Sequence, residues 1–211
     1  RALAIGFDVV ELHSAHGYLL HEFLSPLSNR RTDAYGGSLE NRMRFPLQVA
    51  RALRESWPKE RALGARITAS DWTEGGFGPA DTVAYAHELK AIGFDYLCVS
   101  SGGLIPHQRI KVEPGYQVPF AAQVKRNVPV AVCAVGMIAD PEQAEGILSR
   151  GEADLVALAR GILDDPRWVW HAAERFGVKL EYPPQYARSH PSVWPGAALA
   201  RPQQSPGGKP R

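Results

Sequence analysis

Long apolar runs, secretion signals and clustered basic residues are all missing from this chain of 211 residues. No apolar run approaches the ~20 residues that a membrane-spanning helix needs, and no signal peptide opens the sequence. The formal net charge is only +2, and no basic stripe interleaved with aromatic residues is present. Neither a membrane nor a nucleic acid is therefore expected as a partner, and the composition is typical of a soluble protein.

Cysteine is scarce. The chain has two, Cys98 and Cys133, and no Cys-x-x-Cys motif. Each lies inside an apolar, strand-like run, which favours two buried free thiols over a disulfide. Free thiols are typical of a reducing compartment, so a cytoplasmic location is expected.

No Gly-x-Gly-x-x-Gly motif follows the first apolar segment, which argues against a doubly wound dinucleotide-binding fold. The chain instead repeats itself. Residues 4–8 (AIGFD) recur letter for letter as residues 91–95, and a looser copy (GEAD) occupies 151–154. In each copy the glycine is expected to end a helix in the left-handed conformation, just before a strand begins.

Strands and helices are expected to alternate along the chain. Five strands are predicted, at 7–10, at 65–69, directly after residue 95, at 128–135 and at 155–158. Helices are predicted from 39 to about 57 with Ser38 as N-cap, at 80–92, at 118–127, and from Pro141 with Asp140 as N-cap. This alternation indicates an α/β fold with a parallel sheet, and chemistry-bearing residues after several strands favour a (β/α)8 TIM barrel.

A complete barrel has eight strands and about 250 residues, whereas five strands are expected here. The chain also opens on Arg1-Ala2-Leu3 without a methionine, inside what would be the last turn of a helix. We therefore expect the C-terminal part of a larger barrel, about the last five βα units, with the N-terminal strands missing.

His13, His16 and Tyr18 directly follow the first apolar segment. Active sites of α/β barrels are built at the carboxyl ends of the strands. Two imidazoles can donate hydrogen bonds to one oxygen and a phenol can deliver a proton, which would stabilise an oxyanion and protonate the carbon beside it. Two other interpretations stay open. The histidines can be unrelated, or they can bind zinc, although no further ligand follows at a recognisable spacing.

Residues 6–49 closely resemble the Old Yellow Enzyme family of flavin-dependent ene-reductases. The motifs that carry this resemblance are HSAHGYLL at 13–20, FLSP at 23–26, NRRTD at 29–33, YGGS at 35–38 and ENR at 40–42. Weaker similarity continues to about residue 188. The pairing of two histidines and the ending QYAR at 185–188 resemble the bacterial xenobiotic-reductase branch.

The resemblance implies a barrel that binds FMN and takes hydride from NADPH or NADH. It also implies that His13 and His16 hold the carbonyl or nitro oxygen of an activated alkene, and that Tyr18 protonates the α-carbon. Arg66 would lie at the N1–O2 edge of the flavin, where a permanent positive charge offsets the anion of the reduced ring. A structural ion pair inside the barrel is the alternative interpretation of Arg66.

The resemblance also assigns the phosphate end of FMN to Gly136, Ala159 and Arg160, in the loops after the last two strands. The family usually has glycine where Ala159 stands. Arg188 is also assigned to the cofactor-binding residues. It resembles an arginine that reaches into the active site of a neighbouring subunit, so a homo-oligomer, dimer or tetramer, is expected of the full-length protein.

Two regions follow from these assignments. Residues 1–188 are expected to form the C-terminal part of the FMN-binding barrel, and the Pro- and Gly-rich residues 189–211 a disordered tail. The expected activity is that of an NAD(P)H:flavin oxidoreductase of the NADPH dehydrogenase type. Alternatives are a truncated, cofactor-free fragment without activity, or a metal-dependent barrel lyase or hydrolase that uses His13 and His16.

Overall fold

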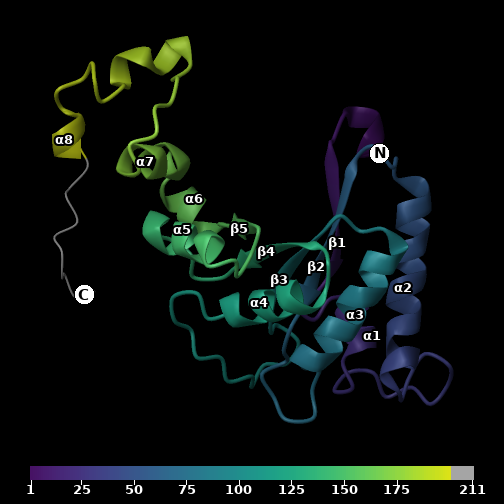
Figure 1. The fold of residues 1–211 in the computed structure, drawn as a ribbon. Helices are drawn as coiled ribbons and strands as arrows, with labels where there is room; N and C mark the ends of the chain where they lie inside the picture. The colour runs from purple at the N-terminus through teal and green to yellow at the C-terminus, as the bar shows by residue number, and fades with distance from the viewer. Residues whose placement is uncertain (201–211) are drawn as a thin grey trace. The chain divides into compact units, whose positions relative to one another are not determined.

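The structure is a computed structural model that describes residues 1–200. It divides into two compact units, residues 1–164 and residues 165–211. The first unit contains the whole sheet (Figure 1). Among residues 1–200, no helix has both the length and the apolar character needed to cross a membrane.

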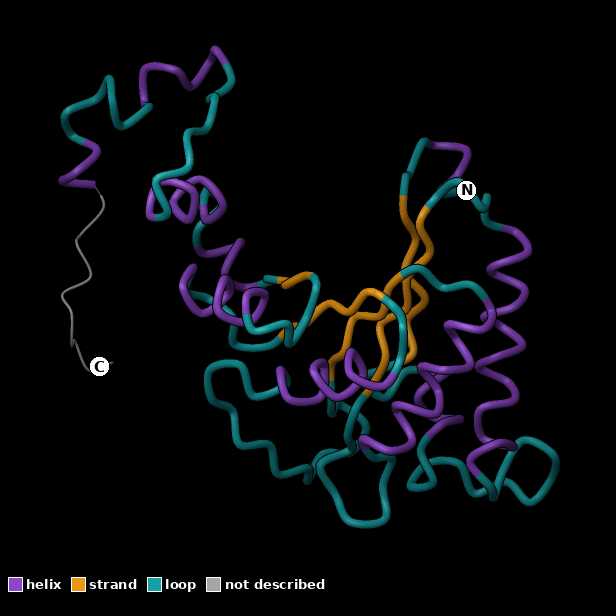
Figure 2. The backbone as a smooth tube through the Cα atoms, in the orientation of Figure 1, coloured by secondary structure: helices purple, strands orange, loops and turns teal. Residues whose placement is uncertain are grey.

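A single five-stranded sheet forms the centre of the first unit, with all its strands parallel and in chain order (Figure 2). The strands are β1 (Val9–Ser14), β2 (Ala62–Thr68), β3 (Tyr96–Ser100), β4 (Ala131–Val135) and β5 (Leu155–Ala157). A parallel sheet in chain order places all carboxyl ends along one edge, as a barrel does.

In the first unit, helices lie between successive strands, with one short helix before the first strand and one after the last. They are η1 (Leu3–Ile5), α1 (Leu19–Leu24), α2 (Leu39–Ser56), α3 (Pro79–Ile92), α4 (Val118–Asn127), α5 (Pro141–Ser149) and α6 (Arg160–Asp164). The first four α-helices pack side by side, α1 on α2, α2 on α3 and α3 on α4, and α4 also contacts β3 and β4 (Figure 1). They cover one face of the sheet.

The predicted helix starts are confirmed. The Ser38 hydroxyl accepts a hydrogen bond from the N–H of Asn41 and caps α2. The Asp140 carboxylate accepts hydrogen bonds from the N–H groups of Glu142 and Gln143 and caps α5. Both caps occupy backbone donors that a helix cannot satisfy internally, which fixes where each helix begins.

The repeated segments have a structural role at the amino ends of the strands. The glycine of each copy is left-handed, as predicted, with φ of 90° at Gly6, 102° at Gly93 and 68° at Gly151. In the second and third copies, the aspartate that follows binds the neighbouring strand. Asp95 accepts a hydrogen bond from Leu63 N–H at 2.8 Å, and Asp154 accepts one from Val132 N–H at 2.8 Å. The repeat thus ends a helix and aligns two strands.

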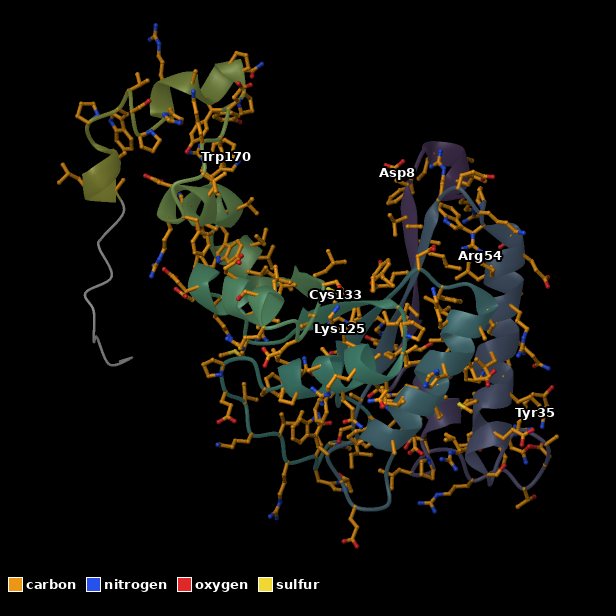
Figure 3. All side chains as sticks on the ribbon, in the orientation of Figure 1. Asp8, Tyr35, Arg54, Lys125, Cys133 and Trp170 are labelled. Carbon is orange, nitrogen blue, oxygen red and sulfur yellow. The ribbon has the colours of Figure 1, made fainter. Side chains whose placement is uncertain are left out.

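The two faces of the sheet differ in character. On the helix-covered face, Leu63, Ala65 and Ile67 of β2 are fully buried. The opposite face carries Arg66 of β2, and Cys98 and Cys133, which are opposite each other on β3 and β4. Both cysteines are free and buried, as the sequence predicted (Figure 3 labels Cys133).

Three predicted strands start at other residues. The second begins at Ala62 instead of 65. The first strand is not 7–10 but Val9–Ser14, so His13 lies within the strand rather than after it. Pairing with β2 continues to Ser14 and supplies the hydrogen bonds that keep this polar stretch extended. The fourth strand starts at Ala131 instead of 128, because Val128 N–H bonds to Val124 O and completes α4.

The second unit contains α7 (Trp168–Arg175), η2 (Pro184–Ser189) and α8 (Ala197–Ala200) within its described residues. Its centre is aromatic: the Trp170 ring lies 4.2 Å from that of Tyr182, and the Arg167 guanidinium lies 5.3 Å from the Trp170 ring centroid (Figure 3 labels Trp170). The boundary after 188 and the disorder of 189–211 stay predictions, and residues 201–211 lie outside the described residues.

Candidate active site

A cavity of about 440 Å³ lies at the carboxyl ends of the strands in the first unit. Its lining brings together residues from β2 and from the ends of, or loops after, the other four strands. Among them are His16, Arg66, Ser100, Gln117, Gly136 and Arg160. Five of the eight predicted site residues therefore share one cavity, although they are far apart in sequence: His16, Arg66, Gly136, Ala159 and Arg160.

His13, His16 and Tyr18 form a ring cluster next to this cavity. The His13 ring centroid lies 5.2 Å from that of His16 and 5.1 Å from that of Tyr18. His13 projects from β1, whereas His16 and Tyr18 come from the turn that follows it. The structure thus confirms that these three side chains lie together, with the Tyr18 side chain largely exposed.

Both histidines of the cluster are neutral at neutral pH. Burial, followed by the positive charge of Arg66, lowers the pKa of His16 to about 4. The same two causes lower the pKa of His13, only partly opposed by the carboxylate of Glu11. A neutral imidazole carries a single N–H, so each ring can donate one hydrogen bond and accept another.

One nitrogen of His16 is occupied by Ser100, which ends β3. His16 Nε2 lies 2.7 Å from Ser100 Oγ. Ser101 already donates to Gln117 Oε1, and Gln117 in turn donates to Val135 O at 2.8 Å. The Ser100 hydroxyl has two acceptors within reach, His16 Nε2 and, at 3.4 Å, Gln117 Oε1. In either case the contact occupies Nε2 of His16 and leaves Nδ1 for another partner.

Ser100 and Gln117 were not singled out from the sequence. Ser100 lies at the carboxyl end of a strand, and this position was a usable signal. Gln117 precedes α4 in a loop and carries no pattern that distinguishes it from other polar loop residues. Only the fold brings its amide next to the ends of β3 and β4.

Arg66 pairs in register with His13 across β1 and β2. Its Nε atom is buried without a hydrogen-bond partner. Within residues 1–200 its guanidinium forms no salt bridge, so the ion-pair interpretation finds no counterpart there. A guanidinium that lines a cavity and has a buried Nε without a partner is suited to hold an anionic or carbonyl-bearing ligand.

The far end of the cavity is formed by the loops after β4 and β5. Gly136 has φ of 110°, and a Cβ atom there would lie 2.3 Å from Gln117 Nε2, so this position requires glycine. Met137, which follows it, also has a positive φ, of 51°. Ala159 and Arg160 line the same end and follow β5. Small residues and one arginine are suited to a phosphate group.

Arg188, the last predicted site residue, belongs to η2 of the second unit. Its proposed role in a neighbouring subunit stays a prediction. Among the described residues, no three His, Cys, Asp or Glu side chains are grouped as a metal site requires.

Comparison with known proteins places this geometry in a family. Residues 1–177 match the model of the NADH:flavin oxidoreductase / NADH oxidase family. The chain belongs to this family, and the resemblance to the Old Yellow Enzymes is confirmed. Among its relatives are the NADPH dehydrogenases of Geobacillus thermodenitrificans (strain NG80-2), 50% identical over 188 residues, and Bacillus subtilis (strain 168), 46% identical over 188 residues.

Solved structures agree with this assignment. Morphinone reductase has a TM-score of 0.66 and 33% identity, and the match covers 87% of this chain and 48% of that one. A 2-naphthoyl-CoA reductase in complex with 2-naphthoyl-CoA has a TM-score of 0.76 and 28% identity, over 82% of this chain and 27% of that one. The likeness confirms the α/β barrel prediction: the five βα units here correspond to part of the fold of these reductases.

The chain spans about half the length of the NADPH dehydrogenases it matches: the alignments cover 89% of this chain, but 54% and 55% of those proteins.

The family also supports the predicted cofactors, a flavin and a nicotinamide hydride donor. The residues present fit FMN, because a cavity-lining arginine with an unpartnered Nε stands at one end and a small-residue cradle with Arg160 at the other.

Proposed function

We propose that the complete protein is an FMN-dependent NAD(P)H oxidoreductase that reduces activated C=C bonds of α,β-unsaturated carbonyl or nitro compounds. One observation carries the proposal: two neutral histidines and a tyrosine form a single cluster beside a cavity that Arg66 also lines. That combination provides hydrogen-bond donors for an oxygen, a proton donor, and a fixed positive charge.

Four residues are proposed to hold the cofactor. Arg66 would contact the N1–O2 edge of the ring, while Gly136, Ala159 and Arg160 would hold the phosphate. Bound FMN supplies the hydride that is transferred to the β-carbon of the alkene. The absence of a Cβ at Gly136 leaves backbone groups accessible to the phosphate oxygens, and the exposed Arg160 guanidinium supplies charged donors.

His13 and His16 are proposed to bind the substrate oxygen. Each neutral ring offers one N–H, and on His16 that proton stands on Nδ1 when Ser100 donates to Nε2. Negative charge develops on the oxygen as the double bond is reduced, and hydrogen bonds from fixed donors strengthen at that moment. The nearby Arg66 charge adds to this stabilisation and also keeps the imidazoles neutral.

Tyr18 is proposed to donate the proton to the α-carbon. Its ring is positioned against that of His13, and its hydroxyl is accessible to a ligand because the side chain is exposed.

We further propose that the protein works in the cytoplasm as a homo-oligomer in which Arg188 completes the active site of a neighbouring subunit. An Arg188→Ala variant that keeps its oligomeric state but loses substrate affinity would support this role.

Purification of the complete protein tests the proposal. A yellow protein whose flavin is released as FMN, and which oxidises NADPH or NADH only when an enone is supplied, is the expected result. A colourless protein whose absorbance shows no bound flavin after FMN is added would refute the proposal. Metal analysis of the same sample separates it from a metal-dependent lyase or hydrolase.

A further inference from the structure

A second polar cluster is buried behind the turn that carries His16 and Tyr18. His21 of α1, Ser25 just after it, and Asp71 in the loop after β2 all have side chains without solvent exposure. His21 Nε2 lies 2.8 Å from Asp71 Oδ1, and Ser25 Oγ donates to Asp71 Oδ2 at 2.6 Å. The proposed cofactor and substrate contacts use none of these residues.

The hydrogen bonds of His21 fix its tautomer. Gly17 N–H donates to His21 Nδ1 at 2.9 Å. A backbone N–H can only donate, so Nδ1 carries no proton and the ring proton stands on Nε2, where it is donated to Asp71. His21 therefore connects the backbone of the turn to the loop after β2 in one defined orientation.

Asp71 is held as a carboxylate, which lets it accept the hydrogen bond from His21. Burial alone would raise its pKa, but hydrogen bonds from His21, Ser25 and the N–H of Phe77 together hold the pKa below its usual value. The Phe77 N–H bond is 2.7 Å long. Because both oxygens of the Asp71 carboxylate accept hydrogen bonds, the ring nitrogen of His21 that faces it must be a donor.

The turn that His21 supports has an unusual backbone. His16 has φ of 58° and Gly17 has φ of 76°, so two successive residues are left-handed. A non-glycine residue in this region persists only where its surroundings hold it. On the other side, the turn packs against the loop after β3: a Cβ at Gly17 would lie 2.5 Å from Gly103 O.

We propose that His21 and Asp71 are positioning residues for alkene reduction: they hold Gly17, and with it the left-handed turn that aims His16 and Tyr18 at the substrate. The inference rests on the function proposed above for His16 and Tyr18. Gly17 lies between those two residues in sequence, so loss of its hydrogen bond to His21 would release both side chains together. Displacements of about 1 Å in a catalytic group can cost on the order of 10²-fold in rate.

Three substitutions in the complete protein separate the two hydrogen bonds of His21. In His21→Asn, the amide oxygen replaces Nδ1 as the acceptor for Gly17. In His21→Gln, the amide nitrogen replaces Nε2 as the donor to Asp71, and the acceptor for Gly17 is lost. In Asp71→Asn, the new amide N–H can donate to His21 Nε2. The ring proton then moves to Nδ1, where it faces the Gly17 N–H and replaces that hydrogen bond with a repulsive contact. His87→Gln, at an exposed histidine of α3, is the matched control.

The expected result is a fall of about 10- to 100-fold in kcat for an enone in His21→Gln and Asp71→Asn. KM and FMN content should change little, and His21→Asn should recover part of the loss. Hydrogen exchange of the Gly17 amide should quicken in the same two variants and stay slow in His21→Asn. Turnover at the control level in His21→Gln and Asp71→Asn, with unchanged Gly17 exchange, would overturn the proposal.

The unaltered protein provides a test that needs no variant. In protein labelled with ¹⁵N-histidine, nitrogen chemical shifts should show His21 protonated on Nε2 and bare on Nδ1. A proton on Nδ1 would overturn the proposal even if every variant failed to fold. If the complete protein lacked FMN or alkene reduction, the proposed function would fail, whereas the tautomer and Gly17 exchange would still report on the turn.

Discussion

His16 Nε2 and Ser100 Oγ lie 2.7 Å apart, although 84 positions separate the two residues in sequence. The contact joins the loop after β1 to the end of β3 at the edge of the cavity. It occupies one nitrogen of His16 and so determines which nitrogen can face a ligand. We therefore expect the hydroxyl of Ser100 to orient His16 for its proposed role in substrate binding.

Replacement of Ser100 by alanine removes this constraint. In the complete protein, we expect Ser100→Ala to weaken binding of phenolic ligands by about 1 kcal/mol, the usual net value of one hydrogen bond. Titration of the protein with a phenol, followed by flavin absorbance, measures this change. Ser149→Ala, at an exposed position at the end of α5, is the control and should bind phenols normally. Unchanged affinity in Ser100→Ala would show that Ser100 does not orient His16.

Loss of both imidazoles should have a larger effect. A phenolate would occupy the oxyanion position between the rings, so replacing His13 and His16 together by alanine should cost on the order of 2–4 kcal/mol of phenol affinity. Alkene reduction should slow, and reduction of the flavin by NAD(P)H should suffer less. The exposed His87→Ala serves as control. Unchanged phenol affinity in the double variant would refute the role assigned to the pair.

Tyr18→Phe should separate two classes of substrate. The variant keeps the ring against His13 but loses the proton, and general-acid catalysis is typically worth ~10²–10⁴-fold. We expect losses of this order for enones, with FMN content and phenol binding nearly unchanged. Nitroalkenes should be less affected at the hydride step, because their products can leave as nitronates and be protonated by solvent. Tyr35→Phe, in the loop before α2 (Figure 3), is the control.

Equal losses for enones and nitroalkenes at that step would point to a positioning role for Tyr18. Stopped-flow measurement of flavin reoxidation by each substrate distinguishes the two outcomes, since it isolates the hydride step from product release.

His16 should make folding stability depend on pH. Its pKa falls from the model-peptide value of 6.5 to about 4 in the folded state, so the unfolded state binds the proton more readily between these values. Stability should therefore be complete above pH 6.5 and decline as the pH falls towards 4. The contribution is at most about 3 kcal/mol, and solvent screening of the half-buried ring reduces it to about 1–2 kcal/mol.

Denaturant unfolding of the complete protein at several pH values measures this decline. His16→Gln has no group that titrates at this position, so its stability should fall less between pH 6.5 and 4. Parallel pH curves for the two proteins would contradict the depressed pKa of His16.

Local sequence signals determined much of the fold, because they act through neighbouring residues. The serine and aspartate caps at Ser38 and Asp140 satisfy donors only a few positions away. The repeated glycines end helices through their own backbone freedom. The proximity of His13, His16 and Tyr18 also followed from sequence, since six positions at the end of one strand cannot spread far apart.

Tertiary structure alone decided the rest. The extent of β1 through His13 depends on hydrogen bonds to β2, more than fifty residues away. The contact of His16 with Ser100 and the bond of His21 to Asp71 join residues 84 and 50 positions apart. No local pattern encodes such pairs, because their hydrogen bonds exist only after the sheet has brought the carboxyl ends of its strands to one edge.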